Sequence, residues 1–237
     1  MTWHSRIAFS CLLAGALGHA ATVTGAVEVA AAGGSKAQLK LDSSGVAVWL
    51  EPERPQPQPA APAPARMVQQ NKQFVPHVLA IQVGAVVDFP NLDPMFHNAF
   101  SNIEGQPFDI GLYPPGTSRR VAFRRPGVVR IFCNIHQSMS AVIVVADTPY
   151  LAVSDKRGSF TMPDVPPGVY TLHLFHERAA QSTLDALARK IEVKENGTHV
   201  AAIRLATSGH IEMPHKNKYG HEYGPEPEDA VTYRKSQ

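Results

Sequence analysis

The sequence predicts an all-β protein with two small domains. Short runs of β-branched and apolar residues recur along the 237-residue chain, with Gly, Pro and Asn turn signals between them. Only one stretch, residues 179–190, has apolar residues at helical spacing. A hydrophobic content of 44% is enough for one large core or two modest ones.

The first twenty residues have the pattern of an export signal. Arg6 precedes an apolar stretch over residues 7–17, and small residues follow up to Ala20. The apolar stretch has about half the ~20 residues that span a bilayer, which argues against a membrane anchor. A lipoprotein signal at Cys11 fits poorly with the residues before it. We expect a signal peptide over residues 1–20, cleaved near Ala20 or Ala21, a periplasmic protein, and no membrane span after cleavage.

Strand patterns begin directly after the signal and are followed by a proline-rich segment. Residues 22–29, 38–41 and 45–50 alternate apolar and polar positions. We assign residues 21–52 to the first part of a β domain. Residues 53–65 contain proline alternating with Gln and Ala, a composition typical of a semi-rigid polyproline II linker.

A run of strands without helical periodicity occupies residues 66–147. Turn signals at Gly84, residues 114–116 and residues 126–127 divide it in the manner of a β-sandwich. The expected strands are residues 78–83, 86–89, 97–101, 119–123, 128–132 and 141–145.

Residues 148–207 continue in strands, with one helical candidate at residues 179–190. Ser182 or Thr183 would cap this helix. Residues 208–237 are polar and rich in Gly, Pro, His and Glu, so we expect a disordered tail.

The charge balance disfavours nucleic acid as a partner. The chain has 22 basic and 20 acidic residues, a formal charge of +2, and no long block of like charge. Arginines at positions 119, 120, 124, 125 and 130 could steer an acidic partner, although a solvated strand edge explains them equally well.

The cysteine of the mature chain lies in a motif with metal-ligand chemistry. Signal cleavage would remove Cys11, so Cys133 cannot form an internal disulfide. The motif C-x2-H-x2-M continues from Cys133 to His136 and Met139. Thiolate, imidazole and thioether, with a second imidazole from a distant strand, form a blue-copper ligand set. We identify His97 as the second imidazole. Such a trio also arises by chance, and buried cysteine often acts as a small hydrophobe; zinc rarely uses Met.

The region from residue 66 to 147, about a third of the chain, resembles plastocyanin/amicyanin-like cupredoxins. This resemblance implies a Greek-key β-sandwich with one type 1 copper ion. It implies Cys133, His97 and His136 as equatorial ligands, a long axial contact from Met139, and Asn98 pinning the cysteine loop. Asn134 departs from the usual Thr or Ser, and no family motif maps onto residues 103–113. The motifs that carry the resemblance are Val83-Gly84, Phe89-Pro90-Asn91, His97-Asn98, Pro126-Gly127 and Phe132-Cys133.

The remaining histidines are weaker candidates. His173 and His176 are three apart on an expected strand and so point to opposite faces, which favours structural roles. The tail histidines could bind metal weakly or simply be solvated; these are His210, His215 and His221. No catalytic set is evident, since multicopper oxidases need His-x-His pairs and copper nitrite reductases need a second, three-histidine site. We therefore expect no enzymatic activity.

Residues 148–207 resemble the later strands of carboxypeptidase regulatory-like, transthyretin-like domains, through residues 153–160 and 163–170. The opening strands of that family are missing there, whereas residues 24–27 and 45–50 match their pattern. We therefore expect the cupredoxin sandwich to be inserted in this domain, the alternative being three domains in a row. The predicted function is single-electron transfer between periplasmic redox proteins, with a copper carrier or sensor as the alternative. A structural protein with a vestigial copper domain is a third possibility.

Overall fold

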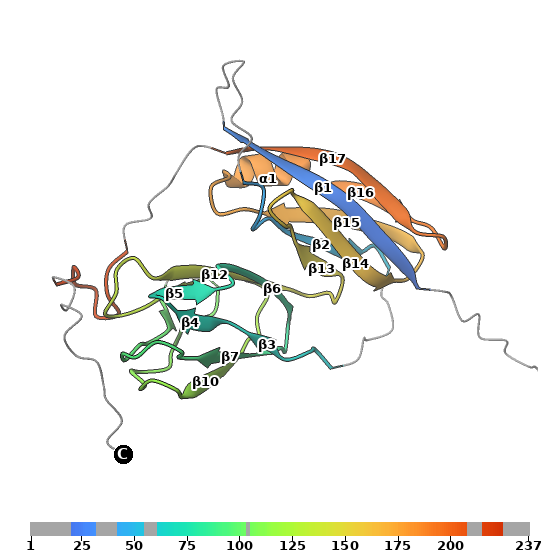
Figure 1. The fold of residues 1–237 in the computed structure, drawn as a ribbon. Helices are drawn as coiled ribbons and strands as arrows, with labels where there is room; N and C mark the ends of the chain where they lie inside the picture. The colour runs from blue at the N-terminus through green and yellow to red at the C-terminus, as the bar shows by residue number, and fades with distance from the viewer. Residues whose placement is uncertain (1–19, 32–41, 55–60, 103–104, 208–214, 225–237) are drawn as a thin grey trace, which may run out of the picture.

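The structure is a computed structural model that describes residues 20–31, 42–54, 61–102, 105–207 and 215–224 (Figure 1). Nearly all of its regular structure is β, which confirms the predicted fold class. None of the helices in these ranges has the length and apolarity to cross a membrane. Residues 1–19 of the expected signal, the expected strand at residues 38–41 and residues 55–60 of the linker lie outside the described ranges.

One β-sandwich is assembled from both ends of the described chain; we call it the end-built sandwich. In its first sheet, β1 lies between β14 and β17, antiparallel to β14 and parallel to β17. In its second sheet, β2 lies between β13 and β15, antiparallel to both. The strands are β1 (Ala21–Ala31), β2 (Ala47–Pro52), β13 (Leu151–Val153), β14 (Ser159–Val165), β15 (Gly168–Phe175), β16 (Arg189–Val193) and β17 (Thr198–Thr207).

The first two strands of the end-built sandwich thus pair with strands more than 100 positions later in the sequence. Side chains alternate between buried and more exposed positions along β1, so that Val23 and Val27 point into the core. Tyr170 and Leu172 of β15 belong to the same core. This pairing is the one that an inserted domain requires. The division of the chain at the predicted residue numbers stays a prediction.

The chain between β2 and β13 forms the second unit, which we call the inserted sandwich (Figure 1). One sheet has the order β10-β7-β3 and the other β6-β12-β11-β8-β9, while β4 and β5 form a hairpin. Period-two burial in β7 directs Val87 and Phe89 into the core. The strands are β3 (Ala65–Arg66), β4 (Val68–Gln70), β5 (Gln73–Val75), β6 (Val78–Gln82), β7 (Val86–Pro90), β8 (Phe100–Ser101), β9 (Phe108–Asp109), β10 (Ser118–Ala122), β11 (Gly127–Phe132) and β12 (Ser140–Ala146).

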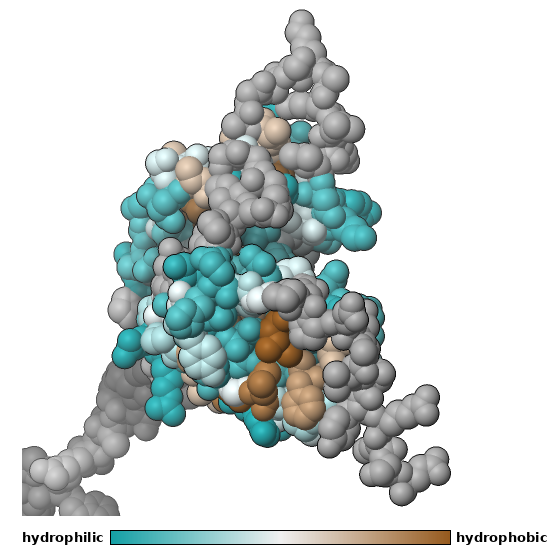
Figure 2. All heavy atoms as spheres, turned by 90° about the vertical axis from the view of Figure 1, so that its left-hand side faces the viewer, coloured by the Kyte–Doolittle hydropathy of each residue, from teal (hydrophilic) through white to brown (hydrophobic). Residues whose placement is uncertain are grey.

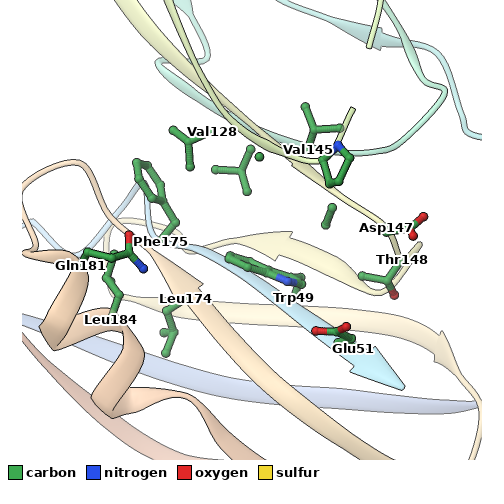
Figure 3. A pocket seen from close by; sticks show the side chains of 14 residues that line it. Trp49, Glu51, Val128, Val145, Asp147, Thr148, Leu174, Phe175, Gln181 and Leu184 are labelled. Atoms are coloured by element: carbon green, nitrogen blue, oxygen red, sulfur yellow. The ribbon is translucent and has the colours of Figure 1, made fainter. Parts of the chain in front are cut away.

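The two sandwiches pack against each other through strands of both. Val78, Val142 and Val144 of the inserted sandwich belong to the buried cluster of the end-built sandwich. Beside this contact lies a cleft of about 420 Å³, lined by Trp49 and by residues of β11, β12, β15 and the helix (Figure 3). Residues of both sandwiches therefore form its walls.

Three local expectations differ from the structure. The helix α1 is Gln181–Leu187, shorter than residues 179–190, because Arg189 begins β16 and pairs with Leu172. Its N-cap is Ala180, without a side-chain bond, so Ser182 and Thr183 lie inside the helix. His97 does not begin a strand but makes an isolated bridge with Tyr113, and β8 starts only at Phe100.

Candidate metal centre

The metal-ligand motif folds as a short loop between two paired strands. Strand β11 ends at Phe132 and β12 begins at Ser140, and these two residues are paired partners. The amide of Cys133 donates to the carbonyl of Met139 over 3.2 Å, and that of Met139 to the carbonyl of His136 over 3.1 Å. The loop therefore brings Cys133, His136 and Met139 to one end of the inserted sandwich.

His97 reaches the same place from the segment between β7 and β8. Its backbone exchanges hydrogen bonds with Tyr113, at 3.2 and 2.9 Å, which fixes the segment across the end of the sandwich. Strand β11 pairs with β8 through Phe132 and Phe100, so the residues just before β8 lie beside the cysteine loop. The fold brings together residues 36 positions apart in the sequence.

Three donor atoms form a compact, buried cluster. The Sγ atom of Cys133 lies 3.9 Å from Nδ1 of His97 and 3.7 Å from Nδ1 of His136. All three donor atoms lie within 4.8 Å of one another. Two ligands that are each about 2 Å from one metal ion lie roughly 3 to 4 Å apart, and both separations from the Cys133 sulfur are in this range. A thiolate with two imidazoles is a donor set that accepts both copper oxidation states.

The cluster is closed off from solvent. His97 and Cys133 have no exposed surface, and His136 is 3% exposed. His136 is thus the most exposed of the three, yet it is buried. Burial raises the pKa of the Cys133 thiol, although backbone amides of Ile135, Asn98 and His136 oppose this shift. Burial also lowers the pKa of His97. In the absence of an ion, both shifts favour neutral side chains.

The structure places the two other sequence-predicted residues around this cluster. Met139 is fully buried and belongs to the same apolar cluster as Cys133. Asn98 accepts a hydrogen bond from the amide of Asn134 at 3.3 Å and donates to Asp109 at 2.7 Å. The Asn98 side chain therefore joins the segment of His97 to the cysteine loop. This link limits the geometry that the site can offer to a metal ion.

Sequence reasoning missed several buried polar residues that support the site. Asp93 accepts from Nε2 of His97 at 2.8 Å. Gln69 donates to the carbonyl of Asn98 at 2.9 Å and accepts from the hydroxyl of Tyr113. Burial raises the pKa of Tyr113 above its ordinary value. In the sequence, Asp93 was the one visible sign of this support, because it lies four residues before His97. The position of Gln69 depends on strand pairing and could not be read from the sequence.

Part of the expected disordered tail is packed on the cysteine loop. His215 is 8% exposed, stacks on Phe132 with ring centroids 4.0 Å apart, and contacts the carbonyl of Gln137 at 3.0 Å. The Tyr223 hydroxyl donates to the carbonyl of Cys133 at 2.9 Å, and the amide of Lys218 to Asn134 at 2.9 Å. Residues 215–224 therefore differ from the expectation because two carbonyl groups of the loop and the ring of Phe132 give them hydrogen-bond and stacking partners. His210 lies outside the described residues.

The other histidines have different surroundings. His173 stacks on Trp49 and contacts Glu51 at 3.1 Å on the surface of the end-built sandwich. His176 is buried, and burial lowers its pKa to about 4. Across the described residues, the group of His, Cys, Asp and Glu side chains able to hold a metal is His97, Cys133 and His136.

Comparisons with known proteins relate part of the chain to copper proteins. No family model and no curated protein matches the sequence. Among similar solved structures, the copper-containing nitrite reductase of Thermus scotoductus is 28% identical over 41% of this chain, with a TM-score of 0.35. The alignment spans only 26% of that reductase. A purple cupredoxin from Nitrosopumilus maritimus is 22% identical over 35% of this chain and 99% of its own, TM-score 0.32. An amicyanin variant is 16% identical over 42% of this chain and 98% of its own, TM-score 0.34.

Proposed function

We propose that this protein binds one type 1 copper ion through Cys133, His97, His136 and Met139, and transfers single electrons between periplasmic redox partners. The observation that carries the proposal is the buried cluster of one thiol and two imidazole nitrogens within 4.8 Å of one another. The ion would supply one-electron chemistry, because thiolate and thioether suit Cu(I) while the two imidazoles keep Cu(II) acceptable.

The chain's own residues hold the donors where an ion needs them. Asn98 ties the cysteine loop to the segment of His97, and the loop's internal hydrogen bonds limit the separation of Cys133 and His136. Such constraint lets both oxidation states share one geometry, which keeps the rearrangement on electron transfer small. Burial of the donors excludes water from the thiolate.

The surface near the cluster suits a transient partner. Leu92 and Leu112 are 55% and 53% exposed, and they lie in the two segments that flank His97. Figure 2 shows hydrophobic side chains gathered on this end of the inserted sandwich amid polar ones. Arg119 and Arg120 of β10 are exposed as well, so we infer an acidic redox partner.

The alternative, a copper carrier, requires a site that exchanges its ion readily. The carrier role is less well supported because all four proposed ligands are at most 3% exposed. An enzymatic role of the nitrite reductase kind would need a second, three-histidine site. We further infer that the end-built sandwich is of the carboxypeptidase regulatory-like kind, exported with the copper domain as one chain.

The test is the visible spectrum of the copper-loaded full chain. A strong charge-transfer band from the thiolate to Cu(II) is expected, one copper per chain, and Cys133→Ala should abolish the band. His173→Ala is the matched control, because that histidine lies outside the cluster, and it should retain the band. Copper bound without the band, or a band that survives in Cys133→Ala, would refute the proposal. Transfer of Cu(I) to an apo acceptor faster than electron self-exchange would favour the carrier.

A further inference from the structure

A buried carboxylate lies on the far side of His97 from the cysteine. Oδ2 of Asp93 is 2.8 Å from Nε2 of His97, while Nδ1 of the same ring faces Sγ of Cys133. Asp93 is only 6% exposed and His97 is not exposed at all. The two ring nitrogens of His97 are thus both engaged, one toward the carboxylate and one toward the cluster.

The hairpin between β4 and β5 keeps Asp93 in its charged form. The backbone amides of Asn71 and Lys72 donate to its two oxygens at 2.6 and 2.8 Å. Both residues have positive φ, 55° and 54°, as a two-residue type I′ turn requires, and for lysine this conformation is unfavourable. Each carboxylate oxygen of Asp93 thus accepts a hydrogen bond from a backbone amide, and such bonds favour the charged form of the group.

An ionised carboxylate can only accept hydrogen bonds, so the proton of His97 resides on Nε2. The lone pair of the neutral ring is then on Nδ1 and points toward Cys133. Asn91 holds the segment in this position, because its Oδ1 accepts from the amide of Asp93 at 3.0 Å. The ring's tautomer and orientation are therefore set before any ion binds.

We propose that Asp93 is a positioning residue for the metal, which holds His97 with Nδ1 toward the cluster and, by its charge, favours Cu(II) over Cu(I). This inference rests on the proposed copper function. A carboxylate bound to Nε2 increases the electron density on the imidazole and makes Nδ1 a stronger donor. The more highly charged Cu(II) gains more from this than Cu(I), so the carboxylate lowers the reduction potential.

Asp93→Asn is the variant that tests this, because it keeps the shape and removes the charge. Partners of this kind typically contribute 10- to 100-fold to metal affinity. We expect the affinity for Cu(II) to fall at least about tenfold more than that for Cu(I), which raises a one-electron potential by about 59 mV. Competition with chelators for each oxidation state measures the affinities, and a redox titration measures the potential.

The matched control is Asp88→Asn, which removes the same charge from β7. The carboxylate of Asp88 contacts Arg66, Arg120 and Ser118 rather than a proposed ligand. If Asp93 only stabilises the turn between β4 and β5, Asp93→Asn will be less stable than the wild type. Its reduction potential will then equal that of Asp88→Asn. That result would overturn the inference.

A measurement on the wild-type protein covers the case in which Asp93→Asn does not fold. In the diamagnetic Cu(I) protein, the Nε2 proton of His97 should give a downfield, slowly exchanging NMR signal. Its absence, with Nε2 shown to be unprotonated, would overturn the inference. A wild-type protein that binds no copper would instead refute the proposed function, so the two failures are distinguishable.

Discussion

The two sandwiches are built from similar strands, but their interiors differ. The core of the end-built sandwich is almost entirely apolar, and its buried polar residues are mostly Ser and Thr at its edges. The inserted sandwich buries a set of larger polar side chains instead. These are Gln69, Asn91, Asp93, His97, Asn98 and His136.

A buried polar group costs free energy unless it is hydrogen-bonded, so a core does not retain such groups for stability alone. In the inserted sandwich they are joined to one another. Tyr113 donates to Gln69, Gln69 donates to Asn98, and Asp93 accepts from His97. One sandwich is therefore packed for stability, while the other holds hydrogen-bonded polar side chains at defined positions.

The largest expected effect comes from separating the two sandwiches. Deleting residues 66–146 and joining the ends by a short flexible linker should leave a folded β domain, because β1 and β2 keep their partners β14, β17, β13 and β15. Thermal unfolding followed by circular dichroism should remain cooperative. The midpoint should fall, since the deletion uncovers the surface that Val78, Val142 and Val144 bury.

Removing residues 21–52 is the complementary deletion. It takes away the central strand of one sheet and a central strand of the other, so the cooperative transition should be lost. An insoluble product from the first deletion, together with a folded fragment of residues 148–207, would contradict the insertion and favour domains in a row.

A smaller effect is expected from the contact of residues 215–224 with the cysteine loop. Tyr223→Phe removes the hydroxyl that donates to the carbonyl of Cys133 and lies 3.2 Å from Nδ1 of His215. The loss should be about 1 kcal/mol in the free energy of unfolding. Denaturant titration measures it, and hydrogen exchange should quicken in the loop but not in the end-built sandwich.

Tyr219→Phe is the control for this change. Tyr219 is 69% exposed, and its ring contacts Lys218. Its hydroxyl should contribute little, so equal losses in the two variants would mean that the Tyr223 contact has no special role at the site.

The smallest expected effect concerns an ion pair that joins the two sandwiches. Nε2 of His77, between β5 and β6, lies 2.9 Å from Oε2 of Glu177, which follows β15. This hydrogen bond raises the pKa of His77 above 6.5 and lowers that of Glu177 below 4.5. The stabilisation of the fold by protonated His77 is complete below pH 6.5 and is lost as the pH rises through its raised pKa. The stabilisation by ionised Glu177 is lost as the pH falls through its lowered pKa.

His77→Gln should therefore cost most between about pH 4.5 and 6.5 and least at pH 9. The side chains are 48% and 34% exposed, so the cost should be only about 0.5 kcal/mol. Denaturant titrations of the wild type and the variant, within that pH range and at pH 9, measure this cost. A difference that does not depend on pH would show that His77 acts by packing alone, and Glu177→Gln should give the same profile as His77→Gln.

Local patterns in the sequence were sufficient for most strands and for one side of the candidate site. Period-two alternation located β1, and apolar runs between turn signals located β7, β11 and β12, within a few residues. The C-x2-H-x2-M motif named three side chains that a single tight loop holds together. Helix length was less accessible, since the pairing of Arg189 with Leu172 ended α1 early.

Only the tertiary structure determined which distant residues contact these local elements. The pairing of β1 with β14 and β17 depends on cores closed over long separations, for which no short-range pattern exists. The same holds for Asp93, whose position depends on backbone amides that lie 22 and 21 residues earlier in the sequence. It also holds for Tyr223, which reaches Cys133 from 90 positions away. The donor types are properties of the sequence, whereas the groups that orient and cover them are properties of the packed chain.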